Sequence, residues 1–154
     1  MPGVLNIGSP APGAELLDEA GGPCAIPRPG RSTLLIFYRG DWCPWCNGQL
    51  ASLARLEGGM EALGAEVVGV SVDPPERNRQ MRTKLRLPFR LLSDPGGTGA
   101  IDRYGAWSAE EGLARPSVVV VDRDGIVRYA QRGEGFADRV SAEAMLAAVE
   151  ACAR

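Results

Sequence analysis

The most regular feature of the chain is a set of three apolar runs, Thr33–Tyr38, Glu66–Val72 and Ser117–Val121. Each run is short and lacks the alternation of polar and apolar positions that marks a half-exposed strand. Strands that are buried on both faces have this pattern, and they occur in parallel or mixed sheets. We therefore predict that the three runs are central strands of such a sheet.

A helical period follows the first run. Within Cys43–Leu63, apolar residues recur at spacings of three, four and seven, which places them on one face of a helix. The Gly58–Gly59 pair weakens this helix by about 1 kcal/mol per glycine relative to alanine, so a break is expected there. Two further helices are predicted: one near Glu76–Leu87, after prolines that suit a first helical turn, and one over Ser141–Ala153, whose serine is the N-cap.

Shorter elements complete the second half of the chain. The Asp124–Gly125 turn signal predicts that Ile126–Gln131 pairs back on the third run as an antiparallel hairpin. A short strand is expected over Phe89–Leu92 and a short helix over Gly97–Tyr104.

Residues 1–31 are rich in Gly and Pro and predict an irregular lead-in with two short strands, around Glu15–Leu17 and Ala25–Ile26. Strands and helices then alternate, and a hairpin comes last. This order predicts a mixed central sheet of about five strands covered by helices on both faces. With no linker or repeat in the sequence, we expect a single domain over residues 1–154, with residues 1–31 as an N-terminal extension.

Composition narrows the class of protein. Hydrophobic residues make up 45% of the 154 residues and charged residues 23%, which is ordinary for a globular protein. The 17 basic and 19 acidic side chains give a formal net charge of −2, so we expect no nucleic-acid partner. The first residues do not resemble a signal peptide, and the longest apolar runs are far shorter than the ~20 residues of a membrane span. A cytoplasmic protein with no membrane partner is therefore expected.

The chain contains no histidine, and this absence removes several kinds of site. Catalytic Ser-His and Cys-His pairs, His-ligated metals and c-type haem attachment all need that side chain. The four cysteines are then the most reactive groups left. In a reducing compartment, a close cysteine pair is more often catalytic or metal-binding than structural. No cofactor is expected.

Cys43 and Cys46 form such a pair, as Cys-Pro-Trp-Cys directly after the first buried run. Pro44 suits position N1 of a helix, because its φ is already helical and its missing N–H would have no partner there. Cys43 is then the N-cap, where its sulfur can accept amide N–H groups at the positive end of the helix dipole. Both effects lower the pKa of the thiol, and the thiolate is the nucleophile. The spacing also lets the two sulfurs form a disulfide across the first turn.

Two other interpretations of the pair remain open. The cysteines could be buried and inert, or they could be half of a metal site. A metal site would need a second Cys-x-x-C, whereas Cys24 and Cys152 stand alone, so no metal is expected. Cys152 is predicted on the inner face of the last helix, and Cys24 is a weak candidate for a distant resolving thiol. A redox pair is the favoured interpretation.

The chain resembles the thioredoxin-fold superfamily, and within it the peroxiredoxin branch, the alkyl hydroperoxide reductase/thiol-specific antioxidant (AhpC/TSA) family. The resemblance covers about residues 4–152. It is carried by the segments GSPAPGAELLDEAGG, EVVGVSVDPPE, LPFRLLSDPGGTGAIDRYGA and SVVVVDRDGIVRY. It implies a thioredoxin-like fold and an oxidoreductase with an antioxidant role.

The segment FYRGDWCPWC departs from the pattern of that family. Its length places the family's peroxidatic cysteine on Cys46. The family's proline seven residues earlier is Arg39 here, and its threonine three residues earlier is Cys43. The family's late arginine falls on Pro116, with Arg115 one step away. The chain thus resembles a peroxiredoxin frame that carries a thioredoxin-like Cys-x-x-C.

Several neighbours of the pair are candidates for supporting roles. In thioredoxin-like sites a cis proline faces the Cys-x-x-C, and the resemblance implies this place for Pro116; the alternative is a trans proline that opens a strand. Trp42 and Trp45 could form an apolar platform, unless one ring packs inward. Arg39 could favour a thiolate or simply be solvated. The expected catalytic residues are Cys43, Cys46 and Pro116, and the expected supporting residues are Arg39, Trp42, Pro44, Trp45 and Arg115.

Three functions fit these residues. The favoured one is a thiol–disulfide oxidoreductase, in which Cys43 attacks a partner disulfide and Cys46 resolves the mixed disulfide. The second is a thiol peroxidase, in which Cys46 attacks hydrogen peroxide or an alkyl hydroperoxide and Cys43 condenses with the sulfenic acid. The third is a redox sensor without turnover. Either enzyme needs an external thiol reductant such as a thioredoxin or glutathione system, and a homodimer is left open.

Overall fold

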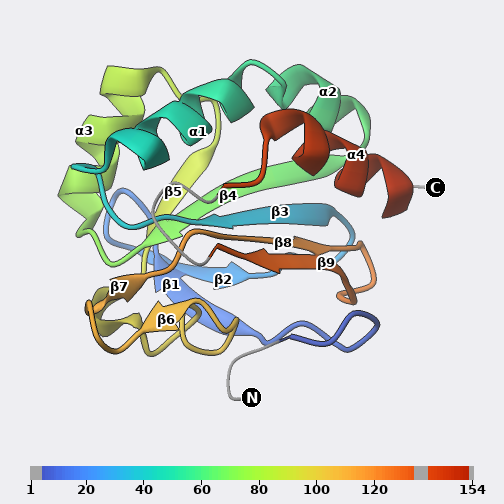
Figure 1. The fold of residues 1–154 in the computed structure, drawn as a ribbon, viewed down its shortest axis with the longest axis horizontal. Coiled ribbons are helices and arrows are strands. Elements are labelled where there is room, and N and C mark those ends of the chain that lie inside the picture. The colour runs from blue at the N-terminus through green and yellow to red at the C-terminus, as the bar shows by residue number, and fades with distance from the viewer. Residues whose placement is uncertain (1–4, 134–138, 153–154) are drawn as a thin grey trace.

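A seven-stranded mixed sheet forms the centre of the molecule (Figure 1). The computed structural model of the chain describes residues 5–133 and 139–152. The strands lie in the order β2-β1-β5-β4-β3-β8-β9. Their bounds are β1 Ala14–Leu17, β2 Pro23–Ile26, β3 Ser32–Phe37, β4 Ala65–Ser71, β5 Arg90–Ser93, β8 Ser117–Val121 and β9 Val127–Arg132.

The three apolar runs of the sequence form the three central strands. β3 lies between β4, to which it is parallel, and β8, to which it is antiparallel. Every residue of β3 and β8 is buried, as the unbroken apolar pattern predicts. β5 and β9 complete a core of five strands, and the two short strands of the lead-in extend it, with β1 paired to β5. The predicted mixed sheet is confirmed.

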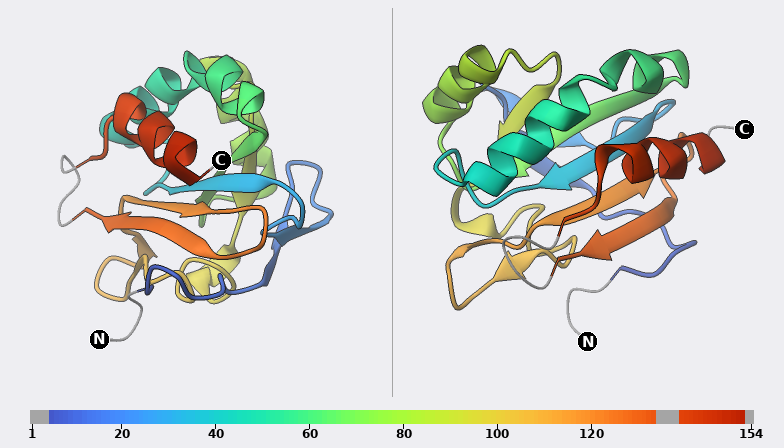
Figure 2. Two further views of the ribbon diagram at one scale, coloured as in Figure 1. Left: turned by 90° about the vertical axis from the view of Figure 1, so that its right-hand side faces the viewer. Right: turned by 45° about the horizontal axis from the view of Figure 1, so that its top comes forward.

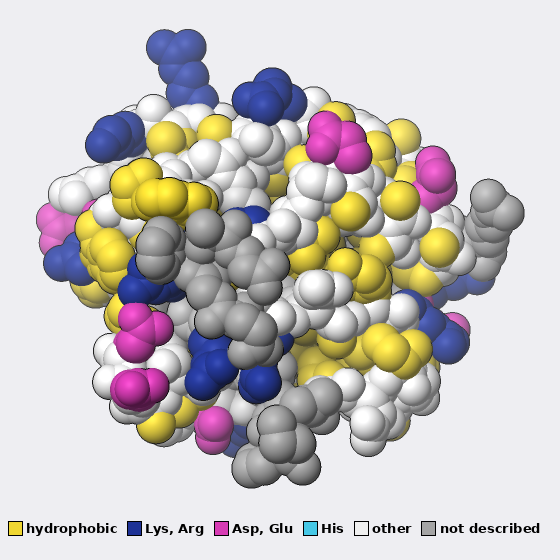
Figure 3. Space-filling view, viewed as in Figure 1, with side chains coloured by type: hydrophobic (Ala, Val, Ile, Leu, Met, Phe, Trp, Pro, Cys, Tyr) yellow, Lys and Arg dark blue, Asp and Glu magenta, His cyan; other side chains and the backbone are white. Residues whose placement is uncertain are grey.

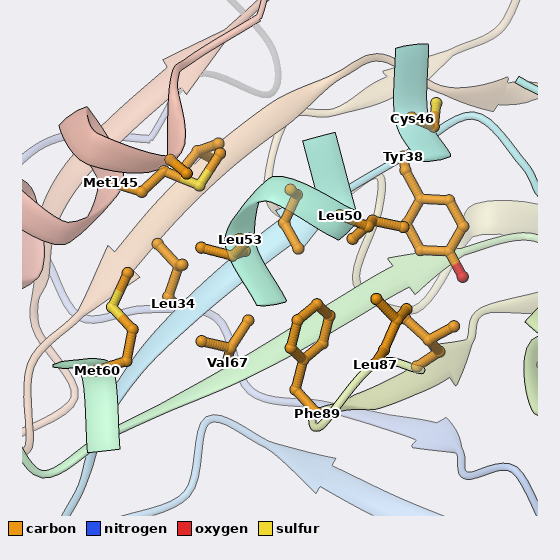
Figure 4. Close-up of a cluster of buried hydrophobic side chains, with 14 of the residues drawn as sticks. Leu34, Tyr38, Cys46, Leu50, Leu53, Met60, Val67, Leu87, Phe89 and Met145 are labelled. Carbon is orange, nitrogen blue, oxygen red and sulfur yellow. The ribbon is translucent and has the colours of Figure 1, made fainter. Parts of the chain in front are cut away.

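The helices pack together against one face of the sheet (Figure 2). The cluster beneath them contains Leu50 and Leu53 from the first helix and Met145 from the last, over Leu34 of β3 and Val67 of β4 (Figure 4). The bounds of the helices are α1 Pro44–Ala54, α2 Glu57–Ala62, α3 Pro75–Leu85 and α4 Ala142–Cys152.

The first helical segment breaks earlier than predicted. α1 ends at Ala54 and α2 begins at Glu57, so the break precedes the Gly58–Gly59 pair. Arg55 and Leu56 donate their N–H groups to carbonyls three residues back, which tightens the last turn of α1. The tight turn redirects the chain, and both glycines lie inside α2.

The opposite face of the sheet is covered without an α-helix in the described part of the chain. The helix expected over Gly97–Tyr104 is absent, and the expectation of helices on both faces is corrected. Residues 94–116 fold there as a 3-10 turn and a small hairpin (Figure 1). Their bounds are Pro95–Gly97 for the turn, and β6 Trp107–Ser108 and β7 Leu113–Ala114 for the hairpin.

The reason for this difference lies at Asp94. Gly96 and Gly97 follow it with φ of 76° and 71°, a conformation that stops a helix. The buried carboxylate of Asp94 then accepts the N–H groups of Ala100 and Ile101, each at 2.8 Å. Backbone donors that a helix would satisfy are satisfied by a side chain, so the segment stays compact without a regular element.

The surface carries charges of both signs. On α3, Arg77 forms ion pairs with Asp41 and Asp73, and Arg82 pairs with Glu19. Basic and acidic side chains are also interspersed on the face shown in Figure 3. Among the residues that the structure describes, no helix has the length and apolar character needed to cross a bilayer.

Close packing around Gly69 of β4 gives a test of the fold. A Cβ there would lie 2.6 Å from Leu91 Cδ2 and 3.2 Å from Tyr38 Cε1. We expect Gly69→Ala to lower the free energy of unfolding by about 1–3 kcal/mol, the usual cost of overpacking. Gly58 in α2 is the control: a Cβ there meets nothing within 4 Å, so Gly58→Ala should raise stability by up to about 1 kcal/mol. Urea unfolding measures both, and a neutral Gly69→Ala would contradict the packing described.

Candidate active site

The cysteine pair lies where the chain leaves β3 and enters α1. Cys43 is the N-cap of α1, with φ −89° and ψ 112°, and Pro44 occupies the first turn. Both placements confirm the prediction from the Cys-Pro-Trp-Cys sequence. Cys46 lies one turn into the helix, beside Tyr38 and at the end of the helix-side cluster (Figure 4).

Each sulfur accepts one backbone N–H, and both share one guanidinium. Cys43 Sγ accepts the N–H of Cys46 at 3.4 Å, and Cys46 Sγ accepts the N–H of Arg39 at 3.4 Å. Arg139 Nη2 lies 3.4 Å from Cys43 Sγ and 3.3 Å from Cys46 Sγ. Both thiols are free, and their exposed fractions are 1% and 0%. Protein donors therefore take the place that water would have around a thiolate.

The two thiols differ in acidity. Burial raises the pKa of Cys43, but hydrogen bonds from the thiol and N–H of Cys46, with the positive charges of Arg139 and Arg39, outweigh it. The pKa of Cys43 therefore lies below its ordinary value. Burial raises the pKa of Cys46 above its ordinary value, and the hydrogen bond with Cys43 adds to this rise. When the reduced pair loses its first proton, the negative charge therefore falls on Cys43, and Cys46 keeps its proton.

Arg139 is the site residue that the sequence analysis missed. It precedes α4 and lies 93 positions after Cys46 in the chain. Gln49 of α1 holds it: the Gln49 side chain accepts from Arg139 Nη1 at 3.3 Å and donates to the carbonyl of Val140 at 3.0 Å. The available sequence signal was an arginine two residues before the N-cap Ser141, which does not identify a partner so distant in the chain.

The loop that leads into Cys43 is fixed from two sides. The N–H of Asp41 donates to Asp73 Oδ2 at 2.9 Å, and the carbonyl of Asp41 accepts from Asn47 Nδ2 at 3.1 Å. Asp73 follows β4 and is buried, and its own N–H donates to Ser71 Oγ. Burial raises the pKa of Asp73, although the Asp41 N–H and the charge of Arg77 oppose the rise. The position of Cys43 therefore depends on an anchor at the end of β4.

Arg39 and the two tryptophans form the outer part of the site. Arg39 Nη2 pairs with Glu111 Oε2 at 2.7 Å, and its guanidinium carbon lies 5.0 Å from the centre of the Trp42 ring. Gly40 permits this contact, because a Cβ there would overlap Trp42 Nε1. Trp42 and Trp45 are 52% and 48% exposed. Both rings therefore stand at the surface, and neither packs inward.

The cis conformation expected for Pro116 is wrong. The cis peptide bond found in the described residues precedes Pro27 instead, and Pro116 is a buried trans proline. Its carbonyl accepts the N–H of Gly133 at 2.6 Å, so it simply opens β8 at the point where pairing with β9 begins. It still lies near the pair's arginine, since Pro116 and Arg139 line one small cavity of about 10 Å³. Arg115 is half-buried, and its N–H donates to the backbone.

The other two cysteines lie outside the site. Cys24 is in β2, within the cluster on the opposite face of the sheet, and its sulfur accepts from Arg90 Nη1 at 2.7 Å. Cys152 ends α4 and packs against the helix-side cluster, as predicted; burial raises its pKa. Within the described ranges, no three His, Cys, Asp or Glu side chains gather as a metal site would require.

The pH dependence of alkylation tests the assignment of acidity. A thiol with a lowered pKa stays ionised at lower pH, so Cys43 should react with iodoacetamide at lower pH than Cys46. Arg139→Gln removes a positive charge beside both sulfurs, so the midpoint for Cys43 should move to higher pH. Initial alkylation rates from peptide mass spectrometry give the midpoints. Lys84→Gln, at an exposed position of α3, is the control. If the pH midpoint for alkylation of Cys43 is the same in Arg139→Gln and Lys84→Gln, the contact with Arg139 is contradicted.

Comparisons with known proteins agree with this architecture. Residues 7–130 match the model of the AhpC/TSA family. Alkyl hydroperoxide reductase E of Mycobacterium tuberculosis is 31% identical over 150 residues, which cover 94% of this chain and 98% of that protein. A putative chloroplastic peroxiredoxin Q of Oryza sativa is 31% identical over 135 residues, which cover 82% of this chain but only 59% of the rice protein.

Solved structures give the same picture of the fold. The crystal structure of peroxidoxin BcpB from Mycobacterium tuberculosis is similar with a TM-score of 0.83 at 25% identity, covering 96% of this chain and 97% of that one. A peroxiredoxin-like protein from Aquifex aeolicus has a TM-score of 0.86 at 19% identity, covering 97% and 88%. From the match over residues 7–130 and the mixed sheet that carries the cysteine pair, we conclude that the chain belongs to the AhpC/TSA family and has its thioredoxin-like, peroxiredoxin-type fold.

Proposed function

We propose that the protein is a thiol peroxidase, an oxidoreductase that reduces hydrogen peroxide or an alkyl hydroperoxide with its Cys43–Cys46 pair. The observation that carries this proposal is the Arg139 guanidinium, within 3.4 Å of both sulfurs. A positive charge there stabilises the attacking thiolate and the oxyanion that leaves it. The family, and relatives named alkyl hydroperoxide reductase E and peroxiredoxin Q, support the same reaction.

Cys46 is the attacking residue in this proposal, because the spacing of FYRGDWCPWC places the family's peroxidatic cysteine there. Its proton first moves to Cys43, with which it is already hydrogen-bonded. The Cys46 thiolate then attacks one peroxide oxygen: an S–O bond forms, the O–O bond breaks, and the leaving oxygen takes a proton from the solvent and departs as water or an alcohol. Cys46 becomes a sulfenic acid.

Cys43 completes the oxidative half of the cycle. Its sulfur attacks the sulfenic sulfur of Cys46, a disulfide forms across the first turn of α1, and the hydroxyl leaves as water with the Cys43 proton. Two external thiol groups then return two electrons and two protons to the pair and are themselves oxidised to a disulfide. We place this reaction in the cytoplasm, where a thioredoxin or glutathione system would supply the thiol, and the exposed rings of Trp42 and Trp45 would border its approach.

The residues that organise peroxide in the family would be replaced by others here. Arg139 would supply the guanidinium that the family takes from the position of Pro116. Arg39 stands in place of the family's proline, but its N–H still reaches Cys46 Sγ at 3.4 Å. Cys43 stands in place of the threonine and would add a resolving thiol within one helical turn.

A second function, thiol–disulfide exchange, is favoured by a different observation. The lowered pKa and the N-cap position belong to Cys43, and exchange begins at the more acidic, helix-capping thiol of a Cys-x-x-C pair. In that reaction Cys43 attacks a partner disulfide, and Cys46 resolves the mixed disulfide. The two functions therefore assign opposite roles to the same two residues.

Single substitutions of the pair separate the two functions. If the peroxidase proposal is right, Cys43→Ser keeps the first oxidation of Cys46, seen by mass spectrometry as a dimedone adduct after peroxide treatment. Cys46→Ser should form no adduct. Arg139→Gln should slow the oxidation by roughly 100-fold, the usual effect of removing one charged donor from a reacting centre. Stopped-flow tryptophan fluorescence gives the rates, and Lys84→Gln serves as the control.

Cys43→Thr is the most discriminating variant, because it restores the threonine of the family. Peroxide oxidation at or above the wild-type rate would establish Cys46 as the peroxidatic residue. Two results together would reject the peroxidase and leave the exchange function. The Cys43→Thr variant would be inert to peroxide and to disulfides, and the Cys46→Ser variant would trap mixed disulfides.

A further inference from the structure

An open groove of about 590 Å³ lies between α1 and the start of α4. One wall carries Trp45, Gln49 and Ser52 of α1 and Arg55 directly after it, and the other wall is formed by residues 139–143. Residues spaced by three or four share one helix face, so this wall follows α1 for about 15 Å. Figure 2 shows α1 and α4 side by side on the same face of the sheet.

Two residues connect this groove to the redox pair. Pro44 borders the groove and directly follows Cys43 in the chain. Arg139 also borders it, and the same guanidinium lies within 3.4 Å of both sulfurs. A molecule in the groove would therefore lie one side chain away from the reacting atoms.

The side chains around the groove favour a small polar anion. Among the described residues that line the groove, Arg55 and Arg139 are basic and Glu143 is acidic. Ser52 and Gln49 add neutral polar groups, and the half-exposed ring of Trp45 adds an apolar surface. The volume lies within the range of roughly 300–1,000 Å³ that is usual for small-molecule sites.

We propose that this groove binds a small peptide-like thiol with carboxylate groups, and that this thiol reduces the Cys43–Cys46 disulfide. The proposal rests on the proposed function, because the thiol acts on the disulfide that peroxide reduction leaves. The guanidinium of Arg55 matches a carboxylate of such a molecule, the positive charge of Arg139 adds to the attraction, and Glu143 matches its ammonium group. A carboxylate-bearing hydroperoxide would lack a group for Glu143.

The burial of the pair favours a small reductant over a protein. The exposed fractions of Cys43 and Cys46 are 1% and 0%, so the surface of a second protein meets neither sulfur directly. A small thiol can instead be held at Pro44 and Arg139, the groove residues next to the pair, before it reacts. Holding a reactant next to its target raises the effective concentration of the attacking group.

The chemistry of the proposed reduction balances with two thiols. The thiolate of the first attacks one sulfur of the disulfide: a bond forms between ligand and protein sulfurs, and the other cysteine leaves as a thiolate. The thiolate of a second ligand attacks the ligand sulfur of this mixed disulfide and releases the remaining cysteine. Two protons from the ligand thiols reach the pair. The pair gains two electrons, and the two ligands leave as one disulfide.

Reduction of the protein by two probe thiols tests the groove. The protein is first oxidised with diamide, so the result does not depend on its reaction with peroxide. Glutathione carries two carboxylates and one ammonium group, whereas 2-mercaptoethanol is neutral. The ratio of their rate constants, followed by tryptophan fluorescence, cancels changes in the reactivity of the disulfide itself. Arg55→Gln is the test variant, and Lys84→Gln, on α3 and outside the groove lining, is its control.

We expect the wild-type rate to saturate with glutathione, and the glutathione-to-mercaptoethanol ratio to fall about fivefold in Arg55→Gln, the size of one exposed ion pair. The ratio should keep its wild-type value in Lys84→Gln. A wild-type ratio in Arg55→Gln, with a rate that rises linearly with glutathione, overturns the proposal. So does an Arg55→Gln variant that slows only oxidation by a carboxylate-bearing hydroperoxide, because the groove then holds the oxidant.

Failure of the peroxidase function gives a different result. In that case the wild-type protein does not react with peroxide, yet the diamide-oxidised form still shows saturable reduction by glutathione and the fivefold loss in Arg55→Gln. That outcome supports the groove as a thiol site and removes the peroxidase.

Discussion

The hydrogen bonds from Arg139 to the two sulfurs are the interaction on which the proposed chemistry of this protein depends. Buried thiols are ordinarily neutral and inert, because a charge without water or a partner is costly. At this site one guanidinium and two backbone N–H groups surround both sulfurs. Gln49 of α1 holds the Arg139 side chain. The backbone position of Arg139 is set by the start of α4, three residues later. The surroundings of both sulfurs therefore depend on how two helices, far apart in sequence, pack against each other.

The arrangement of the layers explains how the two sulfurs are buried and still surrounded by hydrogen-bond donors. The helices share one face of the sheet, and the pair lies at the edge of the cluster beneath them. The other face is closed by residues 94–116 and a separate cluster. Asp73, at the end of β4, fixes the backbone of the loop before Cys43. The sheet thus sets the position of the loop before Cys43. The packing of the helices sets which charged groups lie beside the two sulfurs.

Local features of the sequence predicted the central strands of the sheet and the start of the helix that carries the cysteine pair. The unbroken apolar runs predicted the central strands, and Pro44 after Cys43 predicted the N-cap, because both effects act within a few residues. The sequence did not predict Arg139, since no local rule connects positions 93 residues apart. It also misassigned Gly97–Tyr104 and Pro116. In the first case the Asp94 carboxylate satisfies the backbone in place of a helix, and in the second the antiparallel pairing of β8 with β9 determines the backbone.

The position of Cys43 at the helix N-terminus also affects the redox equilibrium of the pair. In the dithiol, the Cys43 sulfur can carry a negative charge that the Cys46 N–H and two arginines stabilise. In a disulfide the same sulfur is neutral, and most of that stabilisation is lost. Whatever favours the thiolate therefore favours the reduced protein and makes the reduction potential less negative. Such a pair accepts electrons readily from an external thiol. Compared with the same pair without these donors, it gives electrons up less readily and is a weaker reductant of protein disulfides.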